Sequence, residues 1–259
     1  SSHNGAVALL DVAEAGLTSP RVEVSRDGLV FAVLGAARPG TYGAFGKIQL
    51  FDTRNYHAGA FTTMTLAKSD VLDAVSSSRG GGEDMRSPLV DRLSRATFTG
   101  VETSPDGELI LVKTDCAAHV VYDAFDSFPV AVLYDDDATF TTGAQRAASF
   151  AAADSSSSSL SSKQGQGALD PFAFDPPSTC DATFGPDSDC VIGGGDDGLL
   201  RVWRLPATRN TAAQPARLIN KPSALLTCHV APLRQVRFSP SLSVLASACA
   251  NTALWLPPS

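Results

Sequence analysis

One unit recurs along this chain and constrains its fold more than any other feature. The unit is an apolar strand, a tight turn of the Ser-Pro-Asp-Gly type, a second apolar strand, a polar turn, and a third strand that ends in an aromatic residue. Gly suits these turns because it accepts positive φ without steric cost, while Pro presets φ and Asp caps the turn locally. Apolar residues almost nowhere keep the spacing of a helix, so the sequence predicts an all-β fold.

Four copies of the unit follow one another. Their turns are Ser25-Arg26-Asp27-Gly28, Ser104-Pro105-Asp106-Gly107, Gly185-Pro186-Asp187-Ser188 and Ser239-Pro240-Ser241. Their third strands are residues 47–52, 119–123, 200–203 and 253–256, and a fourth strand fits at residues 61–66, 128–133 and 224–227. Four strands in roughly 40 residues is the size of one blade of a β-propeller. We therefore predict a single domain over residues 1–259 with about four blades.

Two polar stretches interrupt the repeat. Residues 68–95 contain a Ser-Ser-Ser-Arg-Gly-Gly-Gly run, and residues 135–178 contain the serine run Ser155–Ser159. Such segments bury too little apolar surface to offset the entropy of ordering them, so we predict low-complexity loops that project between blades. The alternative for Ser69–Val75 is a helical turn. The apolar stretch within Gly5–Val12 is predicted to form an isolated outer strand.

The composition argues against several functions. The formal net charge is −7, and no window gathers Lys and Arg as a groove that follows phosphates requires, so we expect no direct binding of nucleic acid. No apolar run approaches the roughly 18 residues of a membrane span. The cysteines are odd in number and most lie in or beside apolar runs, which predicts reduced, buried thiols; they are Cys116, Cys180, Cys190, Cys228 and Cys249.

The chain resembles a known family at three places. These are Phe51–Tyr56, the stretch Phe98–Phe125, and the run Leu245–Pro257, which ends in Trp-Leu-Pro. They are similar to the WD-repeat subunit of SET-domain (COMPASS-type) histone methyltransferase complexes, whose final blade ends in this way where an ordinary blade continues with Asp. The resemblance covers about residues 17–66, 97–134 and 180–258.

The resemblance implies a WD40-type β-propeller with seven blades, of which this chain would hold the C-terminal half. It also implies a nuclear, non-catalytic scaffold without cofactor or metal. The implied partners are other subunits of an H3 methyltransferase complex and the phosphorylated tail of RNA polymerase II, and members also occur in RNA 3′-end processing and transcription termination machinery. Neither a membrane nor nucleic acid is an expected direct partner.

Blades of this type are held by a hydrogen-bonded network. A His before the first strand bonds a Ser or Thr on the second strand, an Asp in the next turn and a Trp on the third strand. In the third copy Gly193 stands where the hydroxyl would be, and in the fourth Asn251 stands in place of the Asp. The structural network residues implied here are Asp52, Asp123, Asp197, Trp203, His229, Ser247 and Trp255.

The candidates for contact with a partner lie just past the third strand of the first copy. They are Arg54, Asn55, Tyr56 and His57, chosen because Arg54 can pair bidentately with a carboxylate or phosphate. Phe51–Arg54 also resembles the aromatic-Asp-x-Arg box with which some WD proteins bind the adaptor of cullin–RING ubiquitin ligases. A ligase substrate receptor is therefore an alternative function, and pairing of Arg54 with a nearby acid is the purely structural interpretation.

Three further motifs bear on an enzyme or small-molecule site, the second alternative. Gly193–Gly198 satisfies G-x-G-x-x-G, but an expected strand follows it where a dinucleotide site needs a helix, so we predict a turn. Cys228 and His229 are adjacent, yet no third group orients them. Asp135–Asp137 lacks the spacing of a calcium loop and is expected to be the solvated start of a loop. Without acids, bases or ligands in one constellation, catalysis is not expected.

Overall fold

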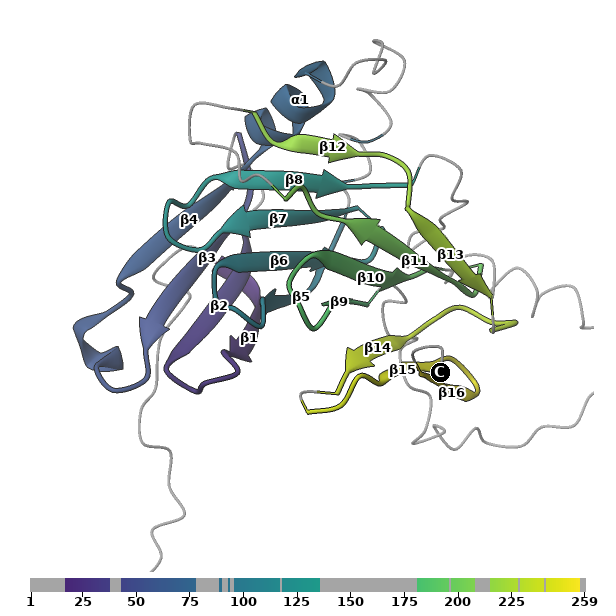
Figure 1. Cartoon of the computed structure of the whole chain (residues 1–259). Helices are drawn as coiled ribbons and strands as arrows, with labels where there is room; N and C mark the ends of the chain where they lie inside the picture. Colours follow the sequence, from purple (N-terminus) through teal and green to yellow (C-terminus); the bar gives the residue numbers. More distant parts are fainter. Residues whose placement is uncertain are drawn as a thin grey trace, which may run out of the picture.

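The structure, a computed structural model, describes residues 17–37, 43–77, 89, 93, 96–116, 118–135, 181–195, 197–207, 215–227, 229–239 and 241–256. In these residues the strands form four sheets, and nearly every neighbouring pair is antiparallel (Figure 1). The all-β prediction is therefore confirmed. No helix in the described ranges is long and apolar enough to cross a membrane.

Each sheet corresponds to one predicted copy of the repeat. Blade 1 comprises β1 (Leu17–Val24), β2 (Val30–Ala37), β3 (Ala44–Asp52) and β4 (Thr62–Ala67). Blade 2 comprises β5 (Phe98–Thr103), β6 (Leu109–Thr114), β7 (His119–Asp123) and β8 (Pro129–Leu133). Blade 3 comprises β9 (Ala182–Phe184), β10 (Cys190–Gly194), β11 (Leu199–Arg204) and β13 (Ala224–Thr227). Blade 4 comprises β14 (Gln235–Phe238), β15 (Leu245–Ala248) and β16 (Thr252–Trp255).

The blades follow one another around an arc. Successive blades are neighbours, because β1 contacts β5 of blade 2, and β9 of blade 3 contacts both β6 of blade 2 and β14 of blade 4. Figure 1 shows the arc running from blade 1 on the left to blade 4 at the lower right, with the two end blades apart. The strand predicted within Gly5–Val12 lies outside the described residues.

The Ser-x-Asp-Gly turns form as predicted. In the first turn, the Ser25 hydroxyl lies 2.6 Å from Asp27 Oδ1, which also accepts a backbone N–H two residues further on. Ser104 and Asp106 repeat this arrangement in the second turn, at 2.5 Å. Gly28 has φ 72°, in the left-handed region that favours glycine. The repeated motif therefore marks a repeated local structure.

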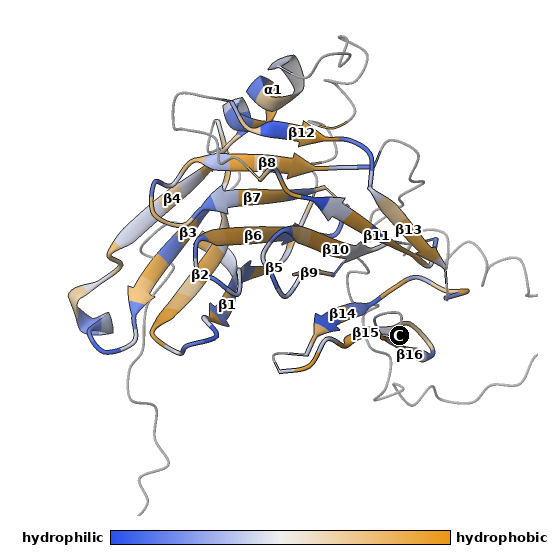
Figure 2. Cartoon of the chain, viewed as in Figure 1, coloured by the Kyte–Doolittle hydropathy of each residue, from blue (hydrophilic) through white to orange (hydrophobic). Residues whose placement is uncertain are grey.

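Blade 2 is buried on both faces, which explains its nearly continuous apolar strands. Ile110 and Val112 of β6 belong to the core shared with blade 1, whereas Leu109 and Leu111 belong to the core shared with blade 3. A third core, which includes Ile192 and Leu233, joins blades 3 and 4. Figure 2 shows the same pattern as hydrophobic colouring along β6, β7, β8 and β10. Packing between blades thus forms the core, as alternation with a period of two residues allows.

The outer edge of blade 2 carries two elements that the repeat did not predict. The strand β12 (Arg217–Ile219) pairs in parallel with β8, so the chain leaves blade 3 after β11, extends blade 2, and returns to blade 3 as β13. The helix α1 (Lys68–Ser77) packs against both β8 and β12. In Figure 1 these elements lie together at the top of the molecule.

The helix α1 corrects the prediction that residues 68–95 are loop from their first residue, and it extends the alternative helical turn at Ser69–Val75. Val71 and Ala74 lie three residues apart on one face of the helix and are buried in the core of blades 1 and 2. Leu89 and Leu93, four residues apart, are buried in the same core. Apolar residues at helical spacing thus anchor part of this insertion, but they are too few to stand out in the sequence. The remainder of residues 68–95 lies outside the described residues.

The cysteines only partly match their prediction. In the described residues Cys116, Cys190 and Cys249 are free thiols, and Cys116 is buried while the other two are half-buried. Burial raises the pKa of the Cys190 thiol to about 12, with the nearby Asp189 carboxylate adding to the effect, so this thiol stays protonated at neutral pH. Cys180 and Cys228 lie outside the described residues.

Candidate functional site

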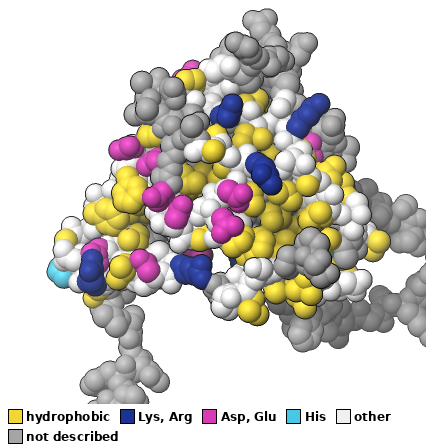
Figure 3. Space-filling model, viewed as in Figure 1, with side chains coloured by type: hydrophobic (Ala, Val, Ile, Leu, Met, Phe, Trp, Pro, Cys, Tyr) yellow, Lys and Arg dark blue, Asp and Glu magenta, His cyan; other side chains and the backbone are white. Residues whose placement is uncertain are grey.

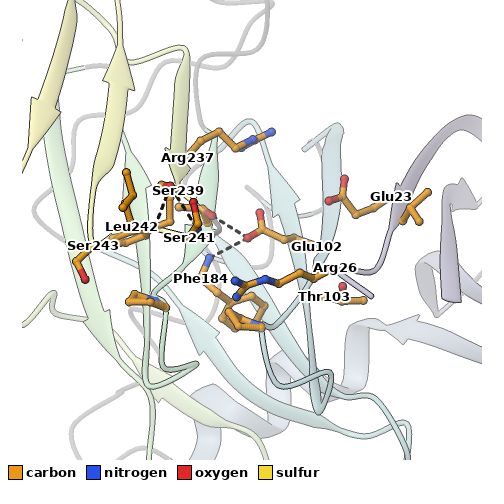
Figure 4. A pocket seen from close by; sticks show the side chains of 15 residues that line it. Glu23, Arg26, Glu102, Thr103, Phe184, Arg237, Ser239, Ser241, Leu242 and Ser243 are labelled. Carbon is orange, nitrogen blue, oxygen red and sulfur yellow. Dashed lines mark hydrogen bonds between the residues drawn. The ribbon is translucent and has the colours of Figure 1, made fainter. Parts of the chain in front are cut away.

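A pocket of about 390 Å³ opens where the innermost strands of all four blades converge. Glu23 of β1, Glu102 of β5, Phe184 of β9 and Arg237 of β14 line it, together with Arg26 in the turn after β1. Figure 4 shows Glu102 near the centre of this pocket, between Arg237 and Arg26. We call this site the channel pocket. It presents both signs of charge on a rigid β framework.

Glu102 is fixed in position by contacts with blade 3 and with its own sheet. Its Oε1 accepts hydrogen bonds from the Thr183 hydroxyl at 2.7 Å and the Phe184 backbone N–H at 3.1 Å. Its Oε2 lies 2.5 Å from Lys113 Nζ, in an ion pair whose lysine is buried and whose carboxylate is partly exposed. Both carboxylate oxygens are therefore occupied, and Glu102 organises the wall of the pocket.

Lys113 also binds a carboxylate of blade 3, and that carboxylate in turn binds blade 4. Lys113 Nζ also lies 3.4 Å from Asp181 Oδ1, just before β9. The other carboxylate oxygen of Asp181 accepts hydrogen bonds from the Arg237 guanidinium and, at 3.1 Å, from the Val236 backbone N–H. Residues of three blades are thus joined in one charged chain. About half of the Arg237 side chain is exposed, and Arg237 also lines the pocket.

Glu23 of blade 1 interacts electrostatically with these charged residues. Burial raises the pKa of its carboxyl above the ordinary range, while Lys113 opposes the rise and Glu102 adds to it. Glu23, Glu102, Arg26 and Arg237 were not singled out in the sequence. The available signal was a charged residue within three of the four innermost strands, at positions where the alternation of apolar residues alone would allow almost any polar side chain.

The predicted partner residues lie elsewhere, at the far end of blade 1. Arg54 is 71% exposed, and its Nε and Nη2 donate to the two oxygens of Asp52 at 3.0 and 2.8 Å. This pair lowers the pKa of Asp52 to about 2. Asn55 precedes a short 3₁₀ helix, η1 (Tyr56–Ala58), in which the rings of Tyr56 and His57 meet edge to face. The four candidates therefore lie together, but Arg54 already holds a carboxylate.

Asp52 and Asp123 close the turns that follow the third strands of their blades. Asp52 Oδ1 accepts the Arg54 backbone N–H at 2.8 Å, and Asp123 Oδ1 accepts the N–H groups of Phe125 and Asp126 at 2.9 and 2.8 Å. Neither carboxylate is bonded to a tryptophan in these contacts. The resemblance placed them in a blade network, whereas the structure places them in local turns.

Blade 4 does bring its network residues together. His229 Nε2 lies 2.7 Å from Ser247 Oγ, and the Trp255 indole N–H donates to the same oxygen at 2.8 Å. His229 Nδ1 lies 3.0 Å from Cys249 Sγ, so a thiol occupies the position expected for Asn251. One assignment satisfies every group: Ser247 donates to Nε2, and Nδ1 donates to the sulfur. His229 is therefore a structural histidine.

Blade 3 is organised differently from the prediction. The Trp203 indole N–H donates to the Tyr134 carbonyl of blade 2 at 3.2 Å, and Asp197 is bonded to Arg201 at 2.9 and 2.6 Å. Asp197 and Trp203 therefore belong to separate contacts. Position 193 also has no room for a larger residue, because a Cβ there would lie 2.9 Å from the Trp203 ring. The indole occupies the space that a serine side chain would need.

The structure also tests the predictions for the glycine-rich motif Gly193–Gly198 and for Asp135. The strand β11 begins directly after Gly198, which has φ 76°, so the predicted turn interpretation of Gly193–Gly198 is confirmed over its described residues. Asp135 is buried and its Oδ2 accepts a hydrogen bond from Arg201 Nε at 2.5 Å. The prediction of a solvated acidic start to the second insertion is therefore wrong at Asp135, because this carboxylate is the counter-ion of a buried arginine.

His119 lies in the interface between blades 2 and 3. Its ring is completely buried and meets the Trp203 ring edge to face at 6.0 Å. Its Nδ1 accepts the Thr114 N–H at 3.3 Å, while Nε2 has no hydrogen-bond partner in the described part of the chain. Burial lowers the pKa of His119 to about 4, and the positive charge of Lys113 acts in the same direction. The native imidazole is therefore neutral at physiological pH.

This buried imidazole predicts a pH-dependent stability. An unfolded histidine binds a proton near pH 6.5, whereas folded His119 does so only near pH 4. The unfolded state therefore holds more protons between these values, and stability falls as the pH is lowered through this window. We expect the urea midpoint to decrease from pH 7 to pH 5, and His119→Leu to show a shallower decrease. An unchanged slope in the variant would assign the dependence to other groups.

Comparisons with known proteins agree with the repeat and the sheets. No family model matches the chain. It is 26% identical over 213 residues to WD repeat-containing protein 82 of Drosophila melanogaster, covering 82% of this chain and 45% of that protein. It is 25% identical over 231 residues to an uncharacterized WD repeat-containing protein of Schizosaccharomyces pombe, covering 89% of this chain and 51% of that protein.

Among solved structures, the Dos1 propeller matches with a TM-score of 0.49 and 14% identity, over 92% of this chain and 41% of that chain. The chain spans about half the length of the curated relatives that it matches. The sequence similarity to WD-repeat proteins accords with the consecutive sheets of three to five strands and with the Ser-x-Asp-Gly turns of blades 1 and 2. The chain therefore resembles WD-repeat proteins in sequence and folds as blades of a WD40-type β-propeller.

Proposed function

We propose that the chain is a non-catalytic scaffold subunit of a nuclear histone methyltransferase complex and links that complex to transcribing RNA polymerase II. Similarity to WD-repeat proteins supports a role in protein–protein interaction. The observation that carries the more specific proposal is the run Leu245–Pro257, which resembles the final blade of the WD-repeat subunit of COMPASS-type complexes. A scaffold subunit acts by binding other proteins, so its functional residues are expected on its surface.

The geometry supports docking of proteins. Short loops are held on rigid sheets, which lets a partner bind without a large loss of conformational entropy. The channel pocket offers the exposed part of Arg237 and the carboxyl of Glu23 within one cavity. Such a cavity suits the charged side chains of a protein segment.

Surface charge favours proteins over nucleic acid as partners. The formal net charge is −7, and on the face seen in Figure 3 the Lys and Arg side chains are scattered singly among acidic and hydrophobic ones. Tight binding of a duplex requires several cations placed to contact successive phosphates. We therefore expect duplex DNA to bind weakly or not at all in a titration with the purified chain.

The proposal is tested by affinity purification of the tagged chain from nuclear extract, followed by mass spectrometry. We expect to recover a SET-domain methyltransferase, and RNA polymerase II whose recovery decreases after phosphatase treatment. Recovery of the cullin–RING adaptor in their place would favour the ligase receptor instead. Recovery of neither would reject both functions for this chain.

Two variants test whether Arg54 makes the polymerase contact. Because Asp52 holds the Arg54 guanidinium through two hydrogen bonds, a phosphate must compete with that carboxylate. We expect Arg54→Ala to reduce polymerase recovery and Asp52→Asn, which removes the competing charge, to increase it. Equal recovery from both variants and the wild type would exclude Arg54 as the contact and leave the scaffold role intact.

A further inference from the structure

A second cavity, of about 550 Å³, lies between blades 1 and 2 beside the channel pocket. Blade 1 contributes Val30, Leu50 and Phe61 to its lining, and blade 2 contributes Ile110 and Phe125, while the two Ser-x-Asp-Gly turns form its edges. We call this site the interblade groove. Its lining is mostly apolar, in contrast to the charged channel pocket.

The groove combines a buried floor with two exposed aromatic rings. Leu50 and Ile110 are buried, so the floor is part of the packed core. Phe61 is 57% exposed and Phe125 is 74% exposed, one from each blade. Large aromatic side chains that remain exposed beside an apolar cavity are typical of binding sites, since a partner that covers them removes apolar surface from water.

The charges at the edge of the groove are chiefly negative. Asp27 and Asp106, at the tips of the two turns, both line it, and each carboxylate is held by the hydroxyl and backbone N–H of its own turn. Hydrogen bonding by Ser25 lowers the pKa of Asp27, which keeps this carboxylate charged. Arg26 also lines the groove, but Figure 4 shows its side chain directed into the channel pocket. An apolar surface with fixed carboxylates at its edge complements a ligand that is apolar and cationic.

The groove and the channel pocket adjoin each other and share part of their lining. Arg26, Thr103 and Pro105 line both cavities. A chain anchored in the groove can therefore extend across these residues and present a charged side chain to the channel pocket. The closeness of the two cavities favours an extended polypeptide over a compact small molecule.

We propose that the interblade groove binds a short extended segment of a partner protein, in which a bulky apolar residue is flanked by Lys or Arg. The apolar side chain packs between Phe61 and Phe125, and the cation lies beside Asp27 and Asp106. This inference rests on the proposed scaffold function and specifies the chemistry of one partner segment.

The probe is a phage-displayed library of random short peptides, selected on the purified chain. We expect the selected peptides to share an aromatic or large aliphatic residue next to Lys or Arg. A selected peptide, made with a fluorescent label, is then titrated into variants of the chain. We expect Phe125→Ala to weaken binding at least about tenfold, as removal of a central aromatic anchor does at other interfaces. We expect Asp27→Asn to weaken it less and to reduce its dependence on salt.

Leu254→Ala is the matched control, because Leu254 is 70% exposed but lies on β16, away from the groove. Both variants remove an exposed apolar side chain, so neither is expected to unfold the chain, and unchanged urea midpoints would verify this. Selection of acidic peptides, failure to select any peptide, or loss of binding in Leu254→Ala but not in Phe125→Ala would overturn the assignment of the groove.

The two proposals can fail separately. Purification of a methyltransferase complex with the Phe125→Ala variant, together with loss of peptide binding, would keep the scaffold function and show that the complex is held by another surface. Selection of basic, apolar peptides that depend on Phe125, with no methyltransferase recovered by the wild type, would keep the groove and reject the complex.

Discussion

Replacing Arg201 with Ala is expected to lower the free energy of unfolding by about 3–5 kcal/mol, the range for removing one partner of a buried ion pair. The Arg201 side chain is 2% exposed and donates to two carboxylates, Asp135 at 2.5 Å and Asp197 at 2.9 and 2.6 Å. Since Asp135 is 5% exposed, the variant leaves a negative charge inside the protein without this cation. Urea unfolding followed by tryptophan fluorescence measures the change.

The control is a second arginine of the described residues that binds a carboxylate through two nitrogens. Arg54 also donates two hydrogen bonds to one carboxylate, that of Asp52, but it does so at the surface. Exposed ion pairs contribute little, because water already solvates both groups. We therefore expect Arg54→Ala to leave the urea midpoint unchanged within error. Similar losses from the two variants would show that burial does not determine the contribution of Arg201.

Strands were predictable because each leaves a local signal. The apolar runs and the turns between them located the predicted third and fourth strands of the repeat to within three residues. The strand β12 left no such signal, since its three residues gain their partner from β8, over eighty positions earlier in the chain. The helix α1 was anticipated only as an alternative helical turn at Ser69–Val75 for a related reason, because few apolar residues, Val71 and Ala74 among them, mark its buried face. Elements that depend on distant packing are weakly encoded in their own residues.

The networks were only partly predictable, for a similar reason. His229 and Ser247 meet in blade 4 as the order of the repeat indicated, because both positions lie within one blade. Trp203 instead bonds to Tyr134 of the preceding blade, and Arg201 to Asp135. Contacts between blades join residues from different copies of the repeat, so the spacing within one copy does not reveal them. The channel pocket escaped prediction for the same reason, since every blade contributes to it.

Replacing Trp203 with Ala is expected to destabilise the chain by about 3–5 kcal/mol, as large-to-small substitutions of buried aromatic residues do. The indole is fully buried between blades 2 and 3, where it packs against His119 and beside Gly193 and donates a hydrogen bond to the Tyr134 carbonyl. Its loss removes a packing contact and a hydrogen bond from the same interface. Urea unfolding followed by far-UV circular dichroism measures the effect without relying on tryptophan emission.

Trp255→Ala provides the matched comparison. Trp255 also ends a third strand and donates an indole hydrogen bond, to Ser247 at 2.8 Å, but it is only half-buried and its bond stays within blade 4. We expect a clearly smaller loss of stability, because Trp255 lies only at the edge of the core between blades 3 and 4 and its truncation breaks no hydrogen bond between blades. Equal losses from the two variants would mean that tryptophans stabilise individual blades, and that the interface between blades 2 and 3 does not depend especially on Trp203.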